Sequence, residues 1–146
     1  MTMNVLMAMQ IFSARVSVAM EMYKDDEKLK DAGPTIAFIK KVKAVIDAMR
    51  SRTSGDALRI NENRSRRQAI VSFITYLQEW KSKAHENNFK FPLTNNTYTG
   101  FIVTLKATLE LLDYLNQEEG YKYLMTNCLC SDPIEVSLLS KRKNVE

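Results

Sequence analysis

The feature that most constrains the fold is an apolar repeat between Thr97 and Gly120. Apolar side chains recur there at steps of three and four residues, at Phe101, Leu105, Leu109, Leu112 and Leu115. This spacing places them on one face of an α-helix. Threonine is a common N-terminal cap and glycine a common helix end. The sequence therefore predicts a helix from Thr97 to Gly120 with this face turned inward.

Three further segments show the same helical spacing, so the chain is expected to be mainly α. The first carries Val5, Met9, Phe12, Val16 and Met20 and ends near Tyr23. The second follows Gly33 and Pro34, a proline suited to a first helical turn, and carries Ile39, Val42, Ile46 and Met49. The third carries Ile70, Phe73, Leu77 and Trp80 and ends at Asn87 and Asn88.

Two connections lack this pattern. Ser51 to Arg67 is polar and rich in arginine, which predicts a long loop or a poorly ordered connection and not a packed element. Tyr121 to Thr126 is short and apolar, and we expect a strand or an extended segment that docks on something outside this chain.

Composition narrows the class of protein. A chain of 146 residues with 45% hydrophobic residues fits one domain. Its net charge of +4 is compatible with a polyanionic partner but does not by itself predict one. The apolar N-terminus is interrupted by Gln10, Ser13, Arg15 and Ser17, so no membrane contact is predicted.

The cysteines argue for a reduced, intracellular chain. Cys128 and Cys130 are too close for an ordinary disulfide loop. With His85 as the only histidine, a zinc site lacks ligands.

Two charged motifs each have two interpretations. The basic residues Arg59, Arg64, Arg66 and Arg67, with Lys81 and Lys83, suit either contact with a DNA backbone or a solvated loop. The run Asp132 to Glu135 has the pattern of a helix start, with Asp132 as the cap, Pro133 at the first helical position and Glu135 at the third. Its second interpretation depends on the family resemblance that follows.

Three stretches together resemble the P element family of transposases. They are Met3 to Ala19, then Ile46 to Arg52, then Leu93 to Thr126 with Gly100, Phe101, Gly120 and Tyr121. The resemblance implies an all-helical GTP-binding insertion that interrupts a ribonuclease H-like domain. On this basis residues 1–118 are expected to form the helical insertion domain, and 119–146 a short C-terminal fragment of the ribonuclease H-like fold.

The resemblance also implies site residues. Asp132 is expected to contact the guanine base of GTP, since a carboxylate accepts from both N1–H and N2–H. Asp47 is the second nucleotide-binding candidate, and Arg50 stands where the family usually has Asn. Glu135 corresponds to the third metal ligand of the catalytic triad. One carboxylate cannot hold the two ions that this chemistry uses, so no metal is expected on the isolated chain, and Mg²⁺ only in a complete transposase.

The expected function is thus a transposase-derived GTP-binding insertion domain that lacks the catalytic half and is not an enzyme by itself. The resemblance implies a nuclear protein whose partners are a transposase or a homologous chain, with transposon DNA bound only in a complete assembly. The alternatives are a non-catalytic interaction or regulatory fragment and an inactive transposon remnant.

Overall fold

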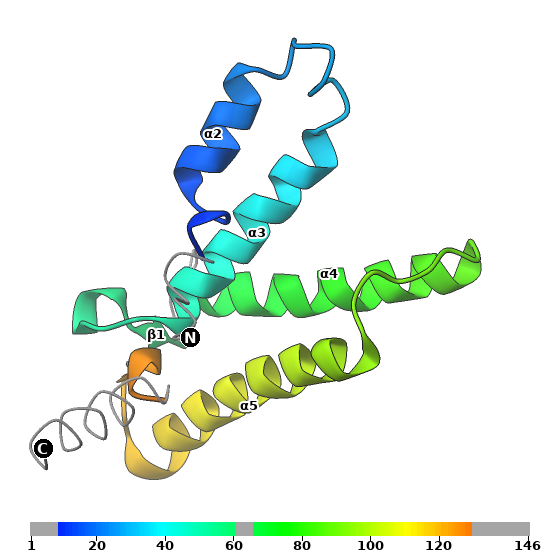
Figure 1. Cartoon of the computed structure of the whole chain (residues 1–146). Coiled ribbons are helices and arrows are strands. Elements are labelled where there is room, and N and C mark those ends of the chain that lie inside the picture. The colour runs from blue at the N-terminus through cyan, green and yellow to red at the C-terminus, as the bar shows by residue number, and fades with distance from the viewer. Residues whose placement is uncertain (1–8, 61–65, 130–146) are drawn as a thin grey trace, which may run out of the picture.

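Two helix pairs make up most of the structure, a computed structural model that describes residues 9–60 and 66–129 (Figure 1). The first pair is α2 (Ala14–Met22) with α3 (Gly33–Met49), and the second is α4 (Arg66–Glu86) with α5 (Asn95–Glu119). The prediction of a mainly α chain is confirmed. No helix in the described ranges is long and apolar enough to cross a membrane.

The helix boundaries follow local capping. Ser13 caps α2 by accepting from the Val16 N–H at 3.4 Å, so the predicted first helix is interrupted by a turn just before it. Thr94, and not the expected Thr97, caps α5, because the Thr97 N–H donates to the Thr94 hydroxyl at 3.2 Å. Gly120 ends α5 as predicted, with a left-handed φ of 69°.

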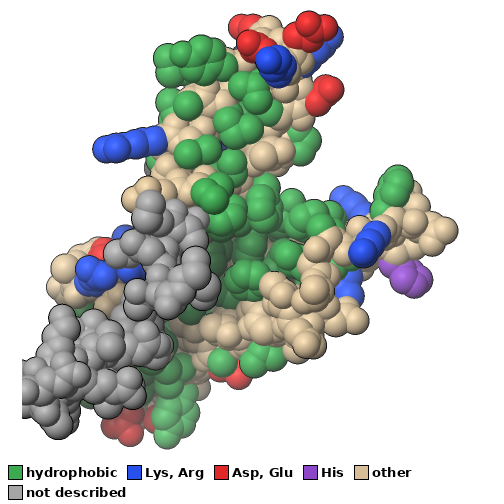
Figure 2. Space-filling model, in the orientation of Figure 1, with side chains coloured by type: hydrophobic (Ala, Val, Ile, Leu, Met, Phe, Trp, Pro, Cys, Tyr) green, Lys and Arg blue, Asp and Glu red, His purple; other side chains and the backbone are tan. Residues whose placement is uncertain are grey.

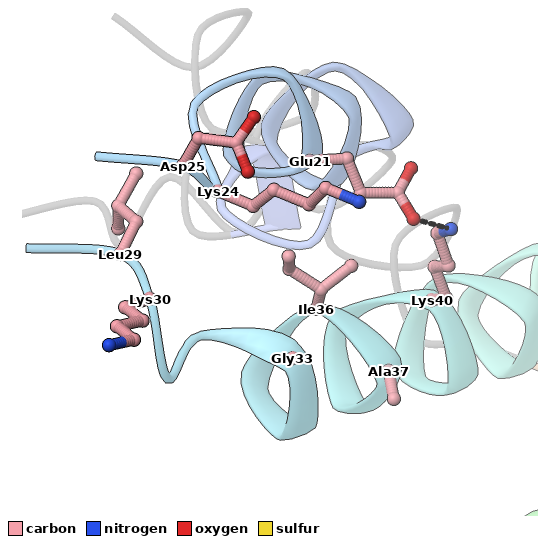
Figure 3. A pocket seen from close by; sticks show the side chains of 9 residues that line it. All are labelled: Glu21, Lys24, Asp25, Leu29, Lys30, Gly33, Ile36, Ala37 and Lys40. Carbon is pink, nitrogen blue, oxygen red and sulfur yellow. Dashed lines mark hydrogen bonds and ion pairs between the residues drawn. The ribbon is translucent and has the colours of Figure 1, made fainter. Parts of the chain in front are cut away.

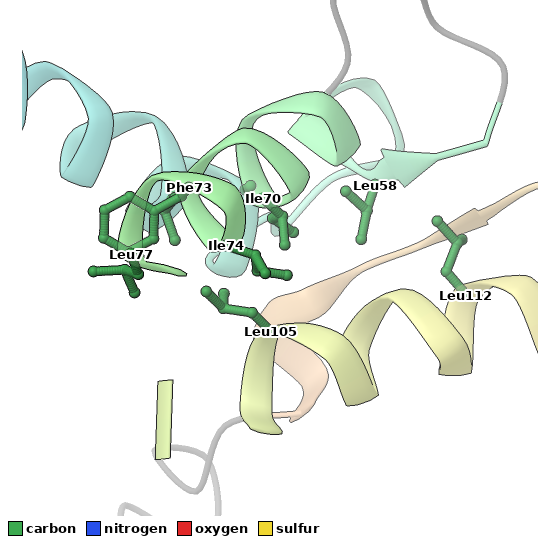
Figure 4. Packing of buried hydrophobic residues seen from close by; sticks show 9 residues of the cluster. Leu58, Ile70, Phe73, Ile74, Leu77, Leu105 and Leu112 are labelled. Carbon is green, nitrogen blue, oxygen red and sulfur yellow. The ribbon is translucent and has the colours of Figure 1, made fainter. Parts of the chain in front are cut away.

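The core lies where α3, α4 and α5 meet a short strand, β1 (Leu58–Arg59), and Val45 and Ala48 of α3 are among its buried residues. In Figure 4, the α4 side chains Ile70 and Ile74 lie between Leu58 of β1 and Leu105 of α5, whereas Leu77 lies at the end of the group farthest from Leu112. The predicted inward positions Ile70, Phe73, Leu77, Leu105 and Leu112 are all buried. Phe101 was expected to face inward but is 44% exposed.

Helix α3 buries more than the single predicted stripe because it packs against α2 on one side and α4 on the other. Ile36, Ile39, Val45 and Ala48 are buried. Of the predicted set, Ile39 is buried, whereas Val42, Ile46 and Met49 are half-buried.

Aromatic side chains join the two helix pairs. The Trp80 ring of α4 lies 5.8 Å from Phe38 of α3 and 5.4 Å from Phe91, which precedes α5. Phe91 in turn lies 5.7 Å from Tyr98. Edge-to-face contacts at these separations are favourable, so Trp80 stabilises the packing of α3 against α4 and the segment before α5.

The prediction of a loose loop after α3 is wrong for residues 51–60. This segment forms a single 3-10 turn, η1 (Ser54–Asp56), and then β1, and it buries Ser51, Ala57 and Leu58. A strand of two residues is too short to show the alternation of apolar and polar residues that predicts a strand. The polar residues around it therefore predicted a loop.

The extended segment after α5 is confirmed, but its partner belongs to the same chain. Strand β2 (Tyr123–Leu124) pairs antiparallel with β1, with Leu58 opposite Leu124, and is followed by a 3-10 turn, η2 (Thr126–Leu129). The expectation of a partner outside the chain is therefore wrong for these residues. The ribonuclease H-like fragment stays a prediction, as does the boundary between residues 118 and 119.

Candidate functional site

A cleft of about 350 Å³ lies at the C-terminal end of α3. We call it the arginine cleft, and it is lined by Ile46, Asp47, Arg50, Arg52, Asp56 and Arg66. Three guanidinium groups thus face two carboxylates in one open depression. The C-terminal end of a helix carries partial negative charge, which favours cations at this place.

Arg66 fixes the wall of the arginine cleft. Its Nη1 donates to the backbone carbonyl of Asp47 at 2.7 Å, one of the last carbonyls of α3, which have no partner within the helix. The same nitrogen lies 3.9 Å from Asp56 Oδ2. The first residue of α4 therefore holds the end of α3 in place.

Asp56 organises the turn beneath the cleft. Its carboxylate accepts from the Thr53 hydroxyl and the Thr53 N–H, both at 2.6 Å, and from the Arg52 N–H at 3.3 Å. These bonds favour the charged form, the Thr53 hydroxyl most of all, and lower the Asp56 pKa to about 2. Asp56 is therefore ionised throughout the neutral range, and its charge is committed to the turn.

Asp47 stands on the exposed rim of the arginine cleft, and Arg50 is half-buried beside it. The Asp47 carboxylate pairs with Lys43 one helical turn earlier, and its side chain is 49% exposed. Arg50 Nη1 lies 3.1 Å from the sulfur of Met9, which directs the guanidinium across the end of α3. Both groups are accessible to a ligand in the cleft.

An apolar groove of about 420 Å³ adjoins the arginine cleft, between α3 and α5. Its lining includes Met9, Val45, Ile46, Met49, Arg50, Gly100, Phe101 and Leu105. Ile46 and Arg50 line both cavities, so an apolar surface and a cationic one meet at these two residues. Figure 2 shows hydrophobic side chains on α2 and α3 and in the hollow between α4 and α5.

The arginines that the sequence grouped into one basic cluster have separate roles. Arg67 Nη2 contacts both carboxylate oxygens of Asp113 on α5, at 3.0 and 2.8 Å. Arg59 donates to the Ser54 carbonyl at 2.8 Å, and its guanidinium lies 5.1 Å from the centre of the Tyr123 ring. Both are occupied by contacts within the fold, whereas Arg64 lies outside the described residues.

A second depression, of about 580 Å³, lies between the end of α2 and the start of α3 (Figure 3). Charges of both signs line it, and Lys40 Nζ is tied to the Glu21 carboxylate at 2.6 Å. Ile36 is its buried apolar side chain. Its three lysines and two carboxylates give the same balance of charge as the arginine cleft, but it presents ammonium groups and no guanidinium fork.

The predicted site residues are only partly within the described ranges. Asp47 lies on the rim of the arginine cleft, whereas Asp132 and Glu135 lie outside the described residues. Within residues 9–60 and 66–129, no three His, Cys, Asp or Glu side chains are grouped so that they could share a metal ion. Glu135, the metal ligand that the resemblance implies, lies outside these ranges, so the magnesium site stays a prediction.

Sequence reasoning did not assign Asp56 or Arg66 to a nucleotide site. The spacing of Thr53 and Asp56 fits a capping box, a signal that was available but short. For Arg66 no local signal exists, because its bond to Asp47 spans the segment between α3 and α4.

Comparison with known proteins adds one finding. Residues 1–59 match the family model described as a TNP-like, GTP-binding insertion domain, and this match supports a transposase-derived origin. It covers Asp47, Arg50, Arg52 and Asp56 of the cleft, but it spans less than half of the chain. Neither curated proteins nor solved structures gave a match.

Proposed function

We propose that this chain is the GTP-binding insertion of a P element-type transposase, and that it binds the nucleotide across the arginine cleft and the apolar groove. One observation carries the proposal: the segment that resembles a GTP-binding domain contains most of the residues lining a cleft with three guanidinium groups.

The chemistry of the cleft suits the phosphates of a nucleotide. Arginine presents a planar fork of donors that matches phosphate oxygens, and Arg50 and Arg52, which follow α3, line the cleft together with Arg66 at the start of α4. Asp56 keeps its negative charge there, and Arg66 Nη1, 3.9 Å from the Asp56 carboxylate, offsets part of it.

The apolar groove suits the base. Phe101 is 44% exposed at its edge and offers an aromatic face for stacking. Asp47 and Asp132 are the two carboxylates proposed to select guanine over adenine. Asp47 is accessible on the rim, whereas Asp132 lies outside the described residues.

In this proposal the chain supports DNA transposition only as part of a larger assembly. Glu135 is then the ancestral metal-binding acid, without a metal site of its own. A magnesium ion enters with the triphosphate or with the catalytic domain of a complete transposase.

Thermal stability with GTP or ATP, in the presence of magnesium, tests the proposal. A ligand at about one hundred times its Kd adds about 2.7 kcal/mol to the stability. For a chain of this size that raises the Tm by roughly 5–10 °C. The proposal expects this rise with GTP and not with ATP.

Two variants locate the effect. Arg50→Ala is expected to abolish the GTP-induced rise, because it removes the cation shared by both cavities. Arg15→Ala is the matched control, since it removes an exposed arginine of α2 that lines neither cavity. Asp132→Ala separately tests guanine selection. No rise with either nucleotide would contradict the proposal.

The second candidate function is a non-catalytic interaction fragment that associates with a homologous chain. Val103 and Tyr114 are 59% and 58% exposed, and their spacing places them on one face of α5. Sedimentation velocity would test this candidate, with a concentration-dependent dimer expected and a monomer at all concentrations contradicting it.

A further inference from the structure

Two buried hydroxyl side chains join the end of α3 to the segment after α5. Ser51 is 0% exposed and Thr126 2% exposed. The Ser51 N–H donates to Thr126 Oγ1 at 3.1 Å, and the Thr126 N–H donates to Ser51 Oγ at 2.8 Å. The two hydroxyl oxygens are 2.9 Å apart. We call this group the Ser51–Thr126 clamp.

The hydrogen atoms of the clamp can be assigned. Thr126 has one hydroxyl hydrogen, and it goes to the carbonyl of Ala48 at 2.7 Å, because a carbonyl only accepts. The bond between the hydroxyls must then use the hydrogen of Ser51. Every donor of both side chains is used, so removing either hydroxyl leaves buried polar groups without partners.

The clamp completes the end of α3 next to the arginine cleft. The carbonyl of Asp47 is capped by Arg66 and the carbonyl of Ala48 by Thr126, so two remote segments replace a local C-terminal cap. Arg50 and Arg52 follow directly and line the cleft. The orientation of the cleft wall therefore depends on where Thr126 is held.

A second link runs from the clamp into the cleft. The Asn127 N–H donates to the Ser51 carbonyl at 3.1 Å, and the Asn127 side chain accepts from Arg52 Nε at 3.4 Å. The segment that leads toward Asp132 is thereby attached to a cleft arginine. The clamp is therefore hydrogen-bonded to the end of α3, and the residue next to it, Asn127, to a cleft arginine.

We propose that Ser51 and Thr126 are positioning residues of the nucleotide site, which set nucleotide affinity without touching the nucleotide. This inference rests on the proposed function. By linkage, nucleotide binding must in turn strengthen the docking of residues 121–129 on the end of α3. A purely structural role predicts lower stability alone, with unchanged affinity for nucleotide.

The test compares three threonine variants by calorimetric titration with GTP, at a temperature where each is folded. Thr126→Val removes the hydroxyl at nearly constant volume and is expected to weaken GTP binding about fivefold or more, the scale of a coupled site. Thr126→Ser keeps the hydroxyl and is expected to restore the affinity. Thr108→Val is the matched control, because Thr108 is 4% exposed and its hydroxyl bonds within α5 at 2.9 Å.

Hydrogen exchange supplies a second readout. GTP is expected to slow the exchange of amides in residues 121–129 in the unchanged chain and to have no such effect in Thr126→Val. If Thr126→Val does not fold, Ser51→Ala takes its place, since it keeps the bonds from the Thr126 hydroxyl to the Ala48 carbonyl and from the Ser51 N–H to that hydroxyl.

The outcomes separate the two proposals. Equal GTP affinity in the unchanged chain and in the folded clamp variants would overturn the positioning role and leave the proposed function intact. Weakening by Thr108→Val equal to that by Thr126→Val would also overturn it. No GTP binding by the unchanged chain would refute the proposed function and the inference with it.

Discussion

Replacing Leu58 by alanine tests whether the segment after α3 belongs to the core. Leu58 is 0% exposed and lies within the cluster that includes Ile70 and Leu112. The substitution removes three carbon groups, which at about 0.8 kcal/mol each gives a transfer loss of about 2.4 kcal/mol. The cavity left behind raises the expected loss to about 3–4 kcal/mol.

Urea unfolding followed by far-UV circular dichroism and by Trp80 fluorescence measures this loss. With an m-value of about 2 kcal/mol per M, the midpoint should fall by about 1.5–2 M. Leu129→Ala is the matched control: that side chain is 49% exposed, so its removal should change the stability by about 0.5 kcal/mol or less. Equal midpoints for the two variants would refute the packing of β1 described above.

Three further predictions follow from the same structure. Folding lowers the Asp56 pKa from 3.8 to about 2, so the unfolded chain binds the proton more tightly and the stability that Asp56 contributes is lost as the pH falls from 3.8 to about 2. In Asp56→Asn the free energy of unfolding should depend less on pH over this interval, and an unchanged pH dependence would contradict this. Gly100→Ala should raise the stability by about 1 kcal/mol because Gly100 is inside α5, whereas Gly120→Ala should lower it by about 1 kcal/mol because Gly120 has a left-handed backbone. Changes in Tm of the same sign for both variants would contradict these conformations. Asp113→Ala should lower the free energy of unfolding by about 1 kcal/mol or less, since both partners of the Arg67–Asp113 pair are about one-third exposed. The fall in the urea midpoint should be smaller in high salt, and an equal fall at low and high salt would argue against an ionic contact.

The helices were predictable because their apolar spacing is long and regular. Ile70, Phe73 and Leu77 recur over enough turns to identify the inner face of α4. The exact cap of α5 was harder, since Thr94 and Thr97 are equivalent residue types and only the bond between them shows which one is the cap.

The candidate site was less predictable because its parts come from distant segments. Asp47 was reached through a resemblance, but the bonds that shape its surroundings come from Arg66 and Thr126. The pairing of β1 with β2 likewise joins residues on either side of two long helices. Such contacts leave no periodic trace in one sequence.

Mapping the nucleotide on the chain by nuclear magnetic resonance tests the central claim most directly. Amide resonances of the ¹⁵N-labelled chain would be followed during titration with GTP and, separately, with ATP. GTP-specific shifts are expected at Asp47, Arg50, Arg52 and Asp56 and at the start of α4. Shifts confined to Glu21, Lys40 and the depression between α2 and α3, or no shifts at all, would contradict the proposed nucleotide site.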